Sequence, residues 1–407
     1  MDNSTSLIIA YNQDRDPERL AMKYDAMRRN AYNFLRGSCH LFHARLPDEK
    51  ALYRAPLAWT CGDMHVGNFG CYRGDNGLSY FDINDFDEAT LAPCTWPVVR
   101  LLASILAAAA DLGFDYSDAL SVAHHTLDAY AIALARGGTR WVERDTSEGD
   151  IRTLFDNLRH RSHAGFLDNR TTRSGKHRKL VLDKDKALPA SEKQRAKIEA
   201  FMAEFAASQP DPRSYKVLDL ARRVSGLGSL GLERYVILVR GQGSPDDCAL
   251  LDLKLARTSS LTPCLVTPEP RWHSEAERIV QAQSFMQAVP AATLHAVEFG
   301  RKSYVLRELQ PTNDRINLND SMKDPLRLAG LLQTMAEVLA WSQLRSSGRK
   351  SAACADELIE FGEKRKWRSR LLEVAQECAR RVEHDWQAYA NAYDAGEIAA
   401  ALAQQGA

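Results

Sequence analysis

The segment Cys61-Gly-Asp-Met-His-Val-Gly-Asn-Phe-Gly70 brings three polar side chains of catalytic type together in one short stretch. They are Asp63, His65 and Asn68, and they lie between glycines, which allow a backbone to turn sharply and to approach a ligand closely. The stretch before them, LAWT, is apolar and aromatic and predicts a short strand that ends at this loop. We therefore interpret the segment as part of a functional site.

A carboxylate-rich segment follows ten residues later and reads Tyr80-Phe-Asp-Ile-Asn-Asp-Phe-Asp-Glu-Ala89. Its apolar beginning predicts a second strand that ends in a loop. Phosphoryl transfer needs metal ligands on the phosphates and a carboxylate that orients or deprotonates the attacking hydroxyl. Asp63 suits the second task, while Asn68, Asp82 and Asp85 offer the oxygen ligands that Mg²⁺ prefers. Two roles stay open for His65. It either orients the loop or contacts a phosphate, or it forms a structural hydrogen bond.

Composition and charge exclude several other classes of protein. The chain has 407 residues, is 45% hydrophobic, and contains 53 basic and 53 acidic residues, so no overall charge favours a nucleic-acid partner. Its longest apolar run, at 101–110, is about half of the roughly 20 residues that a membrane span needs, and predicts a buried helix. The N-terminus lacks a signal-like pattern, so we expect a cytoplasmic protein without a membrane partner. The eight cysteines form no C-x-x-C pair, which argues against a zinc ribbon or a disulfide scaffold.

The hydrophobic pattern changes character along the chain. Apolar residues recur at helical spacing over 16–46, 93–136 and 139–158, and again after 317. Between 215 and 309 the pattern becomes strand-like, interrupted by one helix at 274–289. The polar, basic segment 159–179 is either a solvated connection or a mobile segment near the substrate, whose charge hints at an acidic acceptor. These patterns predict an α+β fold with a helical part and a small antiparallel sheet.

The sheet region contains a glycine-rich turn with Gly226, Gly228, Ser229 and Gly231 in the order G-x-G-S-x-G. A dinucleotide-binding fold requires a helix directly after such glycines, whereas the residues that follow here are β-branched, aromatic and apolar. A glycine loop between two strands is the arrangement with which protein kinases cover nucleotide phosphates. The alternative is a tight hairpin that binds no ligand.

About twenty residues further on, Lys254 lies in the apolar strand pattern CALLDLKLA. A buried ammonium needs a partner or a ligand because an unpaired buried charge is costly, although an edge strand could expose it. In a kinase-type site this lysine bridges the phosphates to a glutamate on the next helix. That helix offers Glu275 and Glu277, of which we favour Glu277.

These residues resemble known phosphotransferases. The stretch GDMHVGN is similar to the G-D-x-H-x-x-N loop of aminoglycoside phosphotransferases and choline-kinase-like enzymes, and NDFDEA resembles their metal-binding segment I-D-F-D-D-A. That register makes Asp85 the principal metal ligand, but the long gap after Asn68 leaves Asp82 as an alternative. With FLRG, GLGSLG and LKLA included, the chain over about residues 15–345 resembles the bacterial domain-of-unknown-function family 2252. This family name implies no reaction.

In protein kinases the glycine loop and the lysine precede the catalytic loop, whereas here they follow it by more than a hundred residues. Circular permutation moves the chain ends without changing the contacts of a fold. The resemblance therefore implies a circularly permuted, two-lobed protein-kinase-like fold. Residues 1–205 and 315–407 would build the helical lobe with the catalytic and metal-binding loops, and 213–310 the nucleotide-binding lobe.

The function expected from these motifs is an ATP- and Mg²⁺-dependent phosphotransferase that acts on a hydroxyl of a small-molecule acceptor. Asp63 is then the base, with His65 and Asn68 in the same loop. Adenylyl transfer from the same site and a catalytically silent, nucleotide-binding regulatory protein remain alternatives. A metal-dependent hydrolase is a weaker hypothesis, because it gives Lys254 and the glycines no role.

Overall fold

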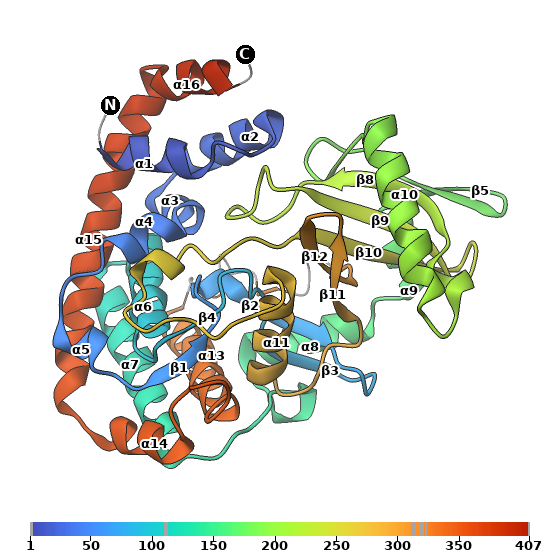
Figure 1. The fold of residues 1–407 in the computed structure, drawn as a ribbon. Helices are drawn as coiled ribbons and strands as arrows, with labels where there is room; N and C mark the ends of the chain where they lie inside the picture. Colours follow the sequence, from blue (N-terminus) through green and yellow to red (C-terminus); the bar gives the residue numbers. More distant parts are fainter. Residues whose placement is uncertain (1–2, 110–112, 311–314, 317–320, 322–323, 406–407) are drawn as a thin grey trace.

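The computed structural model describes residues 3–109, 113–310, 315–316, 321 and 324–405 and shows a mixed α+β fold with antiparallel sheets. Helices gather on one side of the molecule and a six-stranded sheet lies on the other (Figure 1). Three two-stranded sheets, β1 with β4, β2 with β3 and β5 with β6, complete the described strands.

The N-terminal half begins with five helices, α1 (Asn3–Tyr11), α2 (Pro17–Arg28), α3 (Ala31–Gly37), α4 (Cys39–Ala44) and α5 (Lys50–Tyr53). Four short strands follow, β1 (Leu57–Thr60), β2 (Phe69–Arg73), β3 (Ser79–Ile83) and β4 (Thr90–Pro93). The next elements are α6 (Trp96–Ala109), α7 (Tyr116–Arg136), α8 (Gly149–Arg159), α9 (His163–Asp168), β5 (Thr171–Ser174), β6 (His177–Leu180), β7 (Ala187–Leu188) and α10 (Glu192–Ala207).

The second half contains the long strands β8 (Val217–Arg223), β9 (Arg234–Gly243) and β10 (Asp247–Leu255), then α11 (Glu275–Met286), β11 (Leu294–Phe299) and β12 (Lys302–Glu308). The strands predicted between 215 and 309 are thus confirmed, as is the helix among them. The chain ends in α13 (Pro325–Arg345), α14 (Ala355–Glu363), α15 (Lys366–Asp394) and α16 (Glu397–Gln405).

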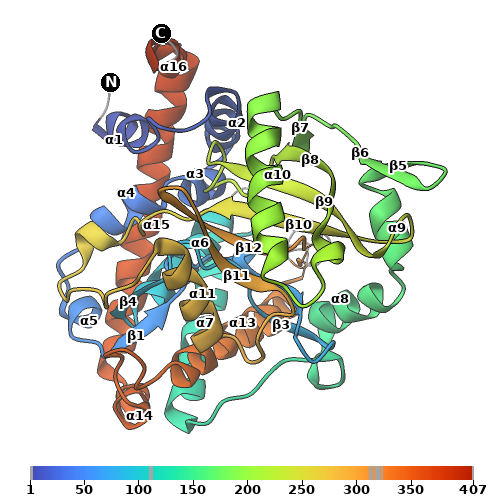
Figure 2. The same cartoon turned by 45° about the vertical axis from the view of Figure 1, so that its right-hand side comes forward.

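The six-stranded sheet has the order β11-β12-β10-β9-β8-β7, and every neighbouring pair is antiparallel. Because side chains alternate across a strand, Leu251 and Leu253 of β10 face one side of the sheet. There they pack in a buried cluster with Phe201 and Met202 of α10, which lies in front of the sheet in Figure 2. The apolar face of the sheet is therefore covered by α10.

The opposite face of the sheet is apolar at one end and charged at the other. Leu250 of β10 belongs to a second buried cluster there, whereas Asp252 and Lys254, on the same face, lie closer to the helical region. Asp252 is fully buried and pairs with three arginines of neighbouring strands, Arg223, Arg234 and Arg307. Burial alone disfavours its charged form, but these guanidinium groups hold the pKa of Asp252 far below its usual range.

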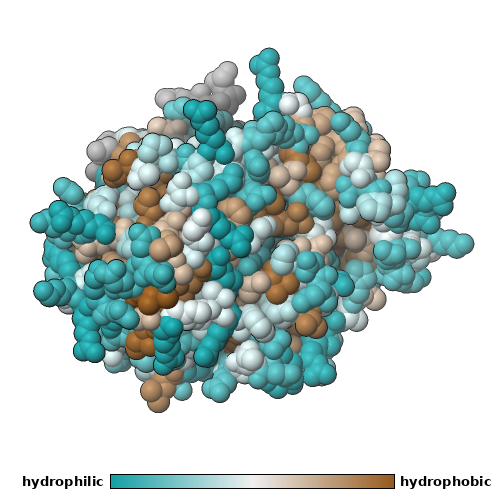
Figure 3. Space-filling view, turned by 60° about the horizontal axis from the view of Figure 1, so that its bottom comes forward, coloured by the Kyte–Doolittle hydropathy of each residue, from teal (hydrophilic) through white to brown (hydrophobic). Residues whose placement is uncertain are grey.

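The helical region is organised around α6, whose side chains are buried along its whole length. Helices α7 and α15 pack against it, α13 packs on α7, and together they form one continuous hydrophobic core. The prediction that the apolar run at 101–110 forms a buried helix is therefore confirmed up to Ala109. Within the described residues, no helix combines the length and the apolar character needed to cross a membrane. On the face shown in Figure 3, hydrophobic side chains are interspersed with hydrophilic ones.

Two segments lie differently from the sequence-based expectations. The expected end of the helical lobe at residue 205 assigns α10 to that lobe. In the structure α10 packs on the sheet instead, because its apolar side chains complete the sheet's hydrophobic core. For the basic segment 159–179 the sequence leaves open a solvated connection or a mobile segment near the substrate, and the structure shows α9 and the β5–β6 hairpin there. Arg178 of β6 is buried and pairs with Asp168, so part of the basic charge is neutralised locally.

Candidate functional site

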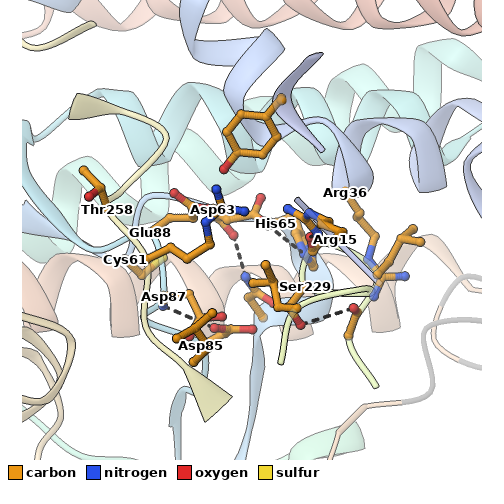
Figure 4. A pocket seen from close by; sticks show the side chains of 18 of the residues that line it. Arg15, Arg36, Cys61, Asp63, His65, Asp85, Asp87, Glu88, Ser229 and Thr258 are labelled. Carbon is orange, nitrogen blue, oxygen red and sulfur yellow. Dashed lines mark hydrogen bonds and ion pairs between the residues drawn. The ribbon is translucent and has the colours of Figure 1, made fainter. Parts of the chain in front are cut away.

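A central cleft lies where the charged end of the sheet meets the helical region. It encloses about 740 Å³, including its open mouth. Residues of the loop at 61–68, the carboxylate segment and the glycine loop line it together with four arginines, Arg15, Arg36, Arg257 and Arg315. Segments far apart in the sequence thus form one site (Figure 4).

Strand β1 ends where the loop at 61–68 begins and so positions this loop in the cleft. Gly62 has a φ of +78°, and a Cβ atom at this position would collide with the backbone of Glu88, so the turn requires glycine. A short helical turn at Val66–Asn68 closes the loop, and the Asn68 side-chain Nδ2 donates a hydrogen bond of 2.5 Å to the backbone oxygen of Asp63. This bond uses the nitrogen of Asn68 and leaves its Oδ1 as the atom that can bind a metal.

Asp63 is held by Arg100, which projects from the buried helix α6 and is itself completely buried. The Nε and Nη2 atoms of Arg100 donate to the same carboxylate oxygen of Asp63 at 2.8 and 2.5 Å, and Nη2 also donates to the backbone oxygen of Leu35. The second carboxylate oxygen of Asp63 is not bound by Arg100. A fixed carboxylate with one oxygen left over is suited to accept a proton from a hydroxyl.

His65 lies beside Asp63 in a structural hydrogen-bond arrangement. Its Nδ1 accepts a hydrogen bond from the backbone of Gly67 at 3.0 Å, which leaves the proton on Nε2, 4.0 Å from Asp63 Oδ2. Burial, together with the nearby guanidinium groups, lowers the pKa of His65 well below its usual value. His65 is therefore neutral at pH 7 and orders the loop.

The aspartates of the carboxylate segment lie in two different places, some in the cleft and one inside the fold. Asp85 and Asp87 line the cleft, and the backbone N–H of Asp87 donates to Asp85 Oδ1 at 3.3 Å. Asp82 lies on β3 and does not line the cleft, since its buried carboxylate pairs with Arg345 at 3.0 Å and accepts a hydrogen bond from Ala288. Asp82 is thus engaged inside the fold, and the structure favours Asp85 and Asp87 as candidate metal ligands.

The candidate donors at this point are carboxylate and amide oxygens, the type of ligand that Mg²⁺ prefers. Among the residues that the structure describes, no three His, Cys, Asp or Glu side chains converge on one point. Mg²⁺ is commonly held by only one or two carboxylates, with waters and substrate phosphates as its other ligands. Asp85, Asp87 and the Oδ1 of Asn68 supply oxygen atoms of the required kind.

Lys254 reaches across from the sheet to these carboxylates. Its side chain is 5% exposed, its Nζ lies 3.9 Å from Asp85, and it forms an ion pair with Asp87. Burial lowers the pKa of Lys254 to about 8, although Asp85 favours its charged form. Burial also opposes the ionisation of Asp85, but the Lys254 ammonium and neighbouring arginines outweigh it and lower the pKa of Asp85. Both groups are therefore charged at pH 7.

The expected partnership between Lys254 and Glu277 is replaced by these aspartates. Glu277 lies in the first turn of α11, where its carboxylate accepts a hydrogen bond of 2.6 Å from the backbone of His273. Glu275, the alternative, pairs with Arg278 at 2.7 Å. Both glutamates serve the start of their own helix, where carboxylates are favoured by the helix dipole.

The glycine loop between β8 and β9 lies directly over Asp63. A Cβ atom at Gly228 would approach the backbone oxygen of Arg36 to 3.4 Å and Asp63 Oδ2 to 3.7 Å. Gly226 and Ser229 also line the cleft, and the Ser229 hydroxyl donates to backbone oxygens within the loop. Gly231, at φ +87°, lies outside the lining and packs on the side chain of Arg15. A turn this close to the loop at 61–68 can bring its backbone amides to a ligand.

The N-terminal helices anchor the tip of the glycine loop. Arg15 donates hydrogen bonds to the backbone oxygens of Gly228 and Leu230 at 2.7 and 2.8 Å, and the buried Lys23 donates to Gly228 at 2.9 Å. Burial lowers the pKa of Lys23 well below its usual value. These contacts fix the position of the loop relative to the cleft.

Several residues of the cleft were not predicted from the sequence, among them Arg15, Arg36, Asp87, Arg100 and Arg315. A signal existed for Arg100, because it is a lone charge inside an apolar helix and such a residue needs a partner. Asp87 lay within the carboxylate segment. Nothing local indicated that Arg15, Arg36 and Arg315 share one cleft.

The fold and the cleft define a mixed α+β protein with a polar, ionisable site between an antiparallel sheet and a helical region. Comparison with known families then gives the particular group. The chain belongs to the family described as "Uncharacterized protein conserved in bacteria (DUF2252)", which matches residues 15–392 and confirms the resemblance seen in the sequence. No curated protein and no solved structure matches it.

Proposed function

We propose that this protein is an ATP- and Mg²⁺-dependent phosphotransferase with a circularly permuted, protein-kinase-like arrangement of its motifs. One observation carries the proposal. Lys254, from the sheet, meets Asp85 and Asp87, from the helical region, across a cleft that the glycine loop covers. These groups are about 170 residues apart in the chain, yet they form the constellation that phosphoryl transfer needs.

The roles follow from the geometry. Asp85, Asp87 and Asn68 would hold Mg²⁺, which neutralises charge on the phosphates when bound. Lys254 and the backbone of the glycine loop bind and orient the nucleotide phosphates. Asp63, fixed by Arg100, accepts the proton of an acceptor hydroxyl through its free oxygen. We place this reaction on a small-molecule acceptor in the cytoplasm.

Nucleotide binding is tested by thermal unfolding with ATP, with and without Mg²⁺. We expect ATP with Mg²⁺ to raise the melting temperature of the native protein, because a ligand that binds only the folded state stabilises it. Lys254→Ala should lose most of this shift. Lys302→Ala is the matched control, since Lys302 lies on the same sheet but is exposed and pairs with Glu233. If Mg²⁺ and ATP leave the melting temperature unchanged, the proposal fails.

Catalysis is tested by product release in the presence of a metabolite mixture. Asp63→Ala should still bind nucleotide but lose turnover; unchanged turnover would remove Asp63 as the base. Release of ADP indicates phosphoryl transfer, whereas release of pyrophosphate indicates adenylyl transfer from the same site. Binding without release of either product indicates a regulatory, nucleotide-binding protein.

A further inference from the structure

We infer that the end of the cleft bounded by Arg36 and Arg315 binds an anionic group, a phosphate or a carboxylate, on the acceptor. The inference rests on the proposed function and narrows its substrate class. It follows from the distribution of charge in the cleft. Most ionic side chains there have hydrogen-bond or ion-pair partners, whereas Arg36 and Arg315 form no side-chain hydrogen bond or ion pair with the residues that the structure describes.

The carboxylates of the cleft are already engaged. One oxygen of Asp63 is taken by Arg100, and Asp85 and Asp87 lie against Lys254. Glu88 accepts a hydrogen bond of 2.5 Å from the backbone of Ser260. None of these carboxylates pairs with Arg36 or Arg315 among the ion pairs of the described residues.

The other two cleft arginines also have partners. Arg15 donates to the glycine loop, and Arg257 pairs with Asp14 at 3.0 Å. Their guanidinium groups thus serve the structure of the cleft wall. Arg15 keeps one unpartnered donor, its Nε, whereas the side chains of Arg36 and Arg315 form no hydrogen bond or ion pair among the described residues.

Arg36 lies near the end of α3, with its guanidinium carbon 5.4 Å from the centre of the Tyr32 ring. Its Nε atom is buried and has no hydrogen-bond partner in the described part of the chain. An aromatic ring orients an arginine without consuming its hydrogen-bond donors. Arg36 therefore keeps its donors available for a ligand.

Arg315 is placed by its backbone, which bridges to Gly70 immediately after the loop at 61–68. Burial lowers the pKa of Arg315, the nearby Asp85 carboxylate opposes this shift, and the neighbouring positive charge of Arg36 adds to it. An arginine nonetheless stays protonated at neutral pH. In the described part of the chain neither guanidinium group forms an ion pair with a carboxylate, and an anion placed between the two would relieve their mutual repulsion.

The position of Arg36 points to the acceptor. Figure 4 shows Arg36 at the opposite end of the cleft from Asp87 and Thr258. The backbone of Arg36 also lies next to Gly228, above Asp63. An acceptor whose anionic group lies at this end can therefore direct a hydroxyl toward Asp63 while the metal and the nucleotide phosphates occupy the end near Asp85 and Lys254.

The test measures anion binding by calorimetry in protein saturated with Mg²⁺ and a non-hydrolysable ATP analogue. Inorganic phosphate and acetate are titrated separately. The anion that binds more tightly shows whether the acceptor carries a phosphate or a carboxylate. We expect Arg36→Gln and Arg315→Gln each to weaken binding about tenfold or more, the worth of a charge-assisted hydrogen bond. Arg36→Lys, which keeps the charge but not the planar fork, should retain part of the affinity.

Arg301→Gln is the matched control, because Arg301 is exposed in the turn between β11 and β12 and should bind the anion as the native protein does. Thermal unfolding of each variant verifies that it is folded. Anion binding that survives in both glutamine variants overturns the inference. The inference is also overturned if the nucleotide analogue abolishes anion binding, because the two arginines would then hold the nucleotide phosphates.

Failure of the proposed function gives a different result. If the analogue itself does not bind, the phosphotransferase proposal is refuted, and phosphate is titrated into the protein without nucleotide. Binding that depends on Arg36 and Arg315 then still supports an anion site at this end of the cleft. Absence of such binding overturns the inference as well.

Discussion

Replacement of Arg100 by methionine tests the arrangement that fixes Asp63. Methionine keeps an unbranched side chain of similar length, so the cavity left behind is small. The change removes two hydrogen bonds to the Asp63 carboxylate and one to the Leu35 carbonyl. It leaves a carboxylate whose side chain is only 18% exposed without its counter-charge.

Breaking a buried ion pair by removing one partner costs about 3–5 kcal/mol of unfolding free energy. Because Asp63 is partly exposed to the cleft and can recover some hydration, we expect about 3 kcal/mol. Asp63→Asn should also destabilise the protein, since it leaves the buried guanidinium paired only with a neutral oxygen. The double variant should lose less than the sum of the two single losses, by about 1–3 kcal/mol, because the residues interact directly.

These four proteins, the native protein, the two single variants and the double variant, form a double-mutant cycle. Their stability is measured by urea unfolding, monitored by circular dichroism. Arg29→Met is the control, since Arg29 forms an exposed pair with Asp25 and its loss should change stability by no more than about 0.5 kcal/mol. A loss below about 1 kcal/mol for Arg100→Met, or strict additivity in the cycle, would refute the view that this pair holds the Asp63 carboxylate.

Two further predictions concern the sheet side of the cleft. Because the pKa of Lys254 is lowered to about 8, the ammonium loses its proton as the pH rises through that value, so the affinity for Mg²⁺–ATP should fall between pH 7 and 9. Calorimetry at constant Mg²⁺ measures this, and Lys254→Arg should show a flat profile because arginine stays charged; a flat profile for the native protein contradicts the prediction. Asp252→Asn should destabilise the fold by about 3 kcal/mol, because it leaves three arginines around a fully buried neutral group. Urea unfolding measures that loss, with exposed Asp246→Asn as the control, and equal stability of the two variants would contradict it.

Local sequence was a good guide wherever the signal lay within a few neighbouring residues. The alternation in CALLDLKLA predicted β10, and the glycines of the segments 61–70 and 226–231 predicted tight turns. The structure brings Asp63, His65, Asn68, Asp85, Gly226, Gly228 and Ser229 to one cleft, with Lys254 at its wall. Polar residues that follow strands collect at the same edge of a fold, and this could be recognised without coordinates.

The errors arose where a side chain had several neighbours within reach. Asp82 was a plausible metal ligand by composition, but it pairs with Arg345, more than 260 residues away in the chain. Glu277 lay on the expected helix, yet its carboxylate caps that helix. In each case the choice of partner depended on which elements pack together, and that information is not local.

The sequence by itself determined which parts of the chain are mainly helical and which are strand-rich, the turns that need glycine and the chemical types of the groups in the two loops. These are consequences of backbone sterics and of hydrophobic periodicity, which act over a few residues. Only the tertiary structure decided that Arg100 holds Asp63, that Lys254 faces Asp85 and Asp87, and that Arg36 and Arg315 line the same cleft. Pairing of buried charges depends on distance and burial in three dimensions, because desolvation makes an unpaired charge costly and selects whichever partner packing brings near.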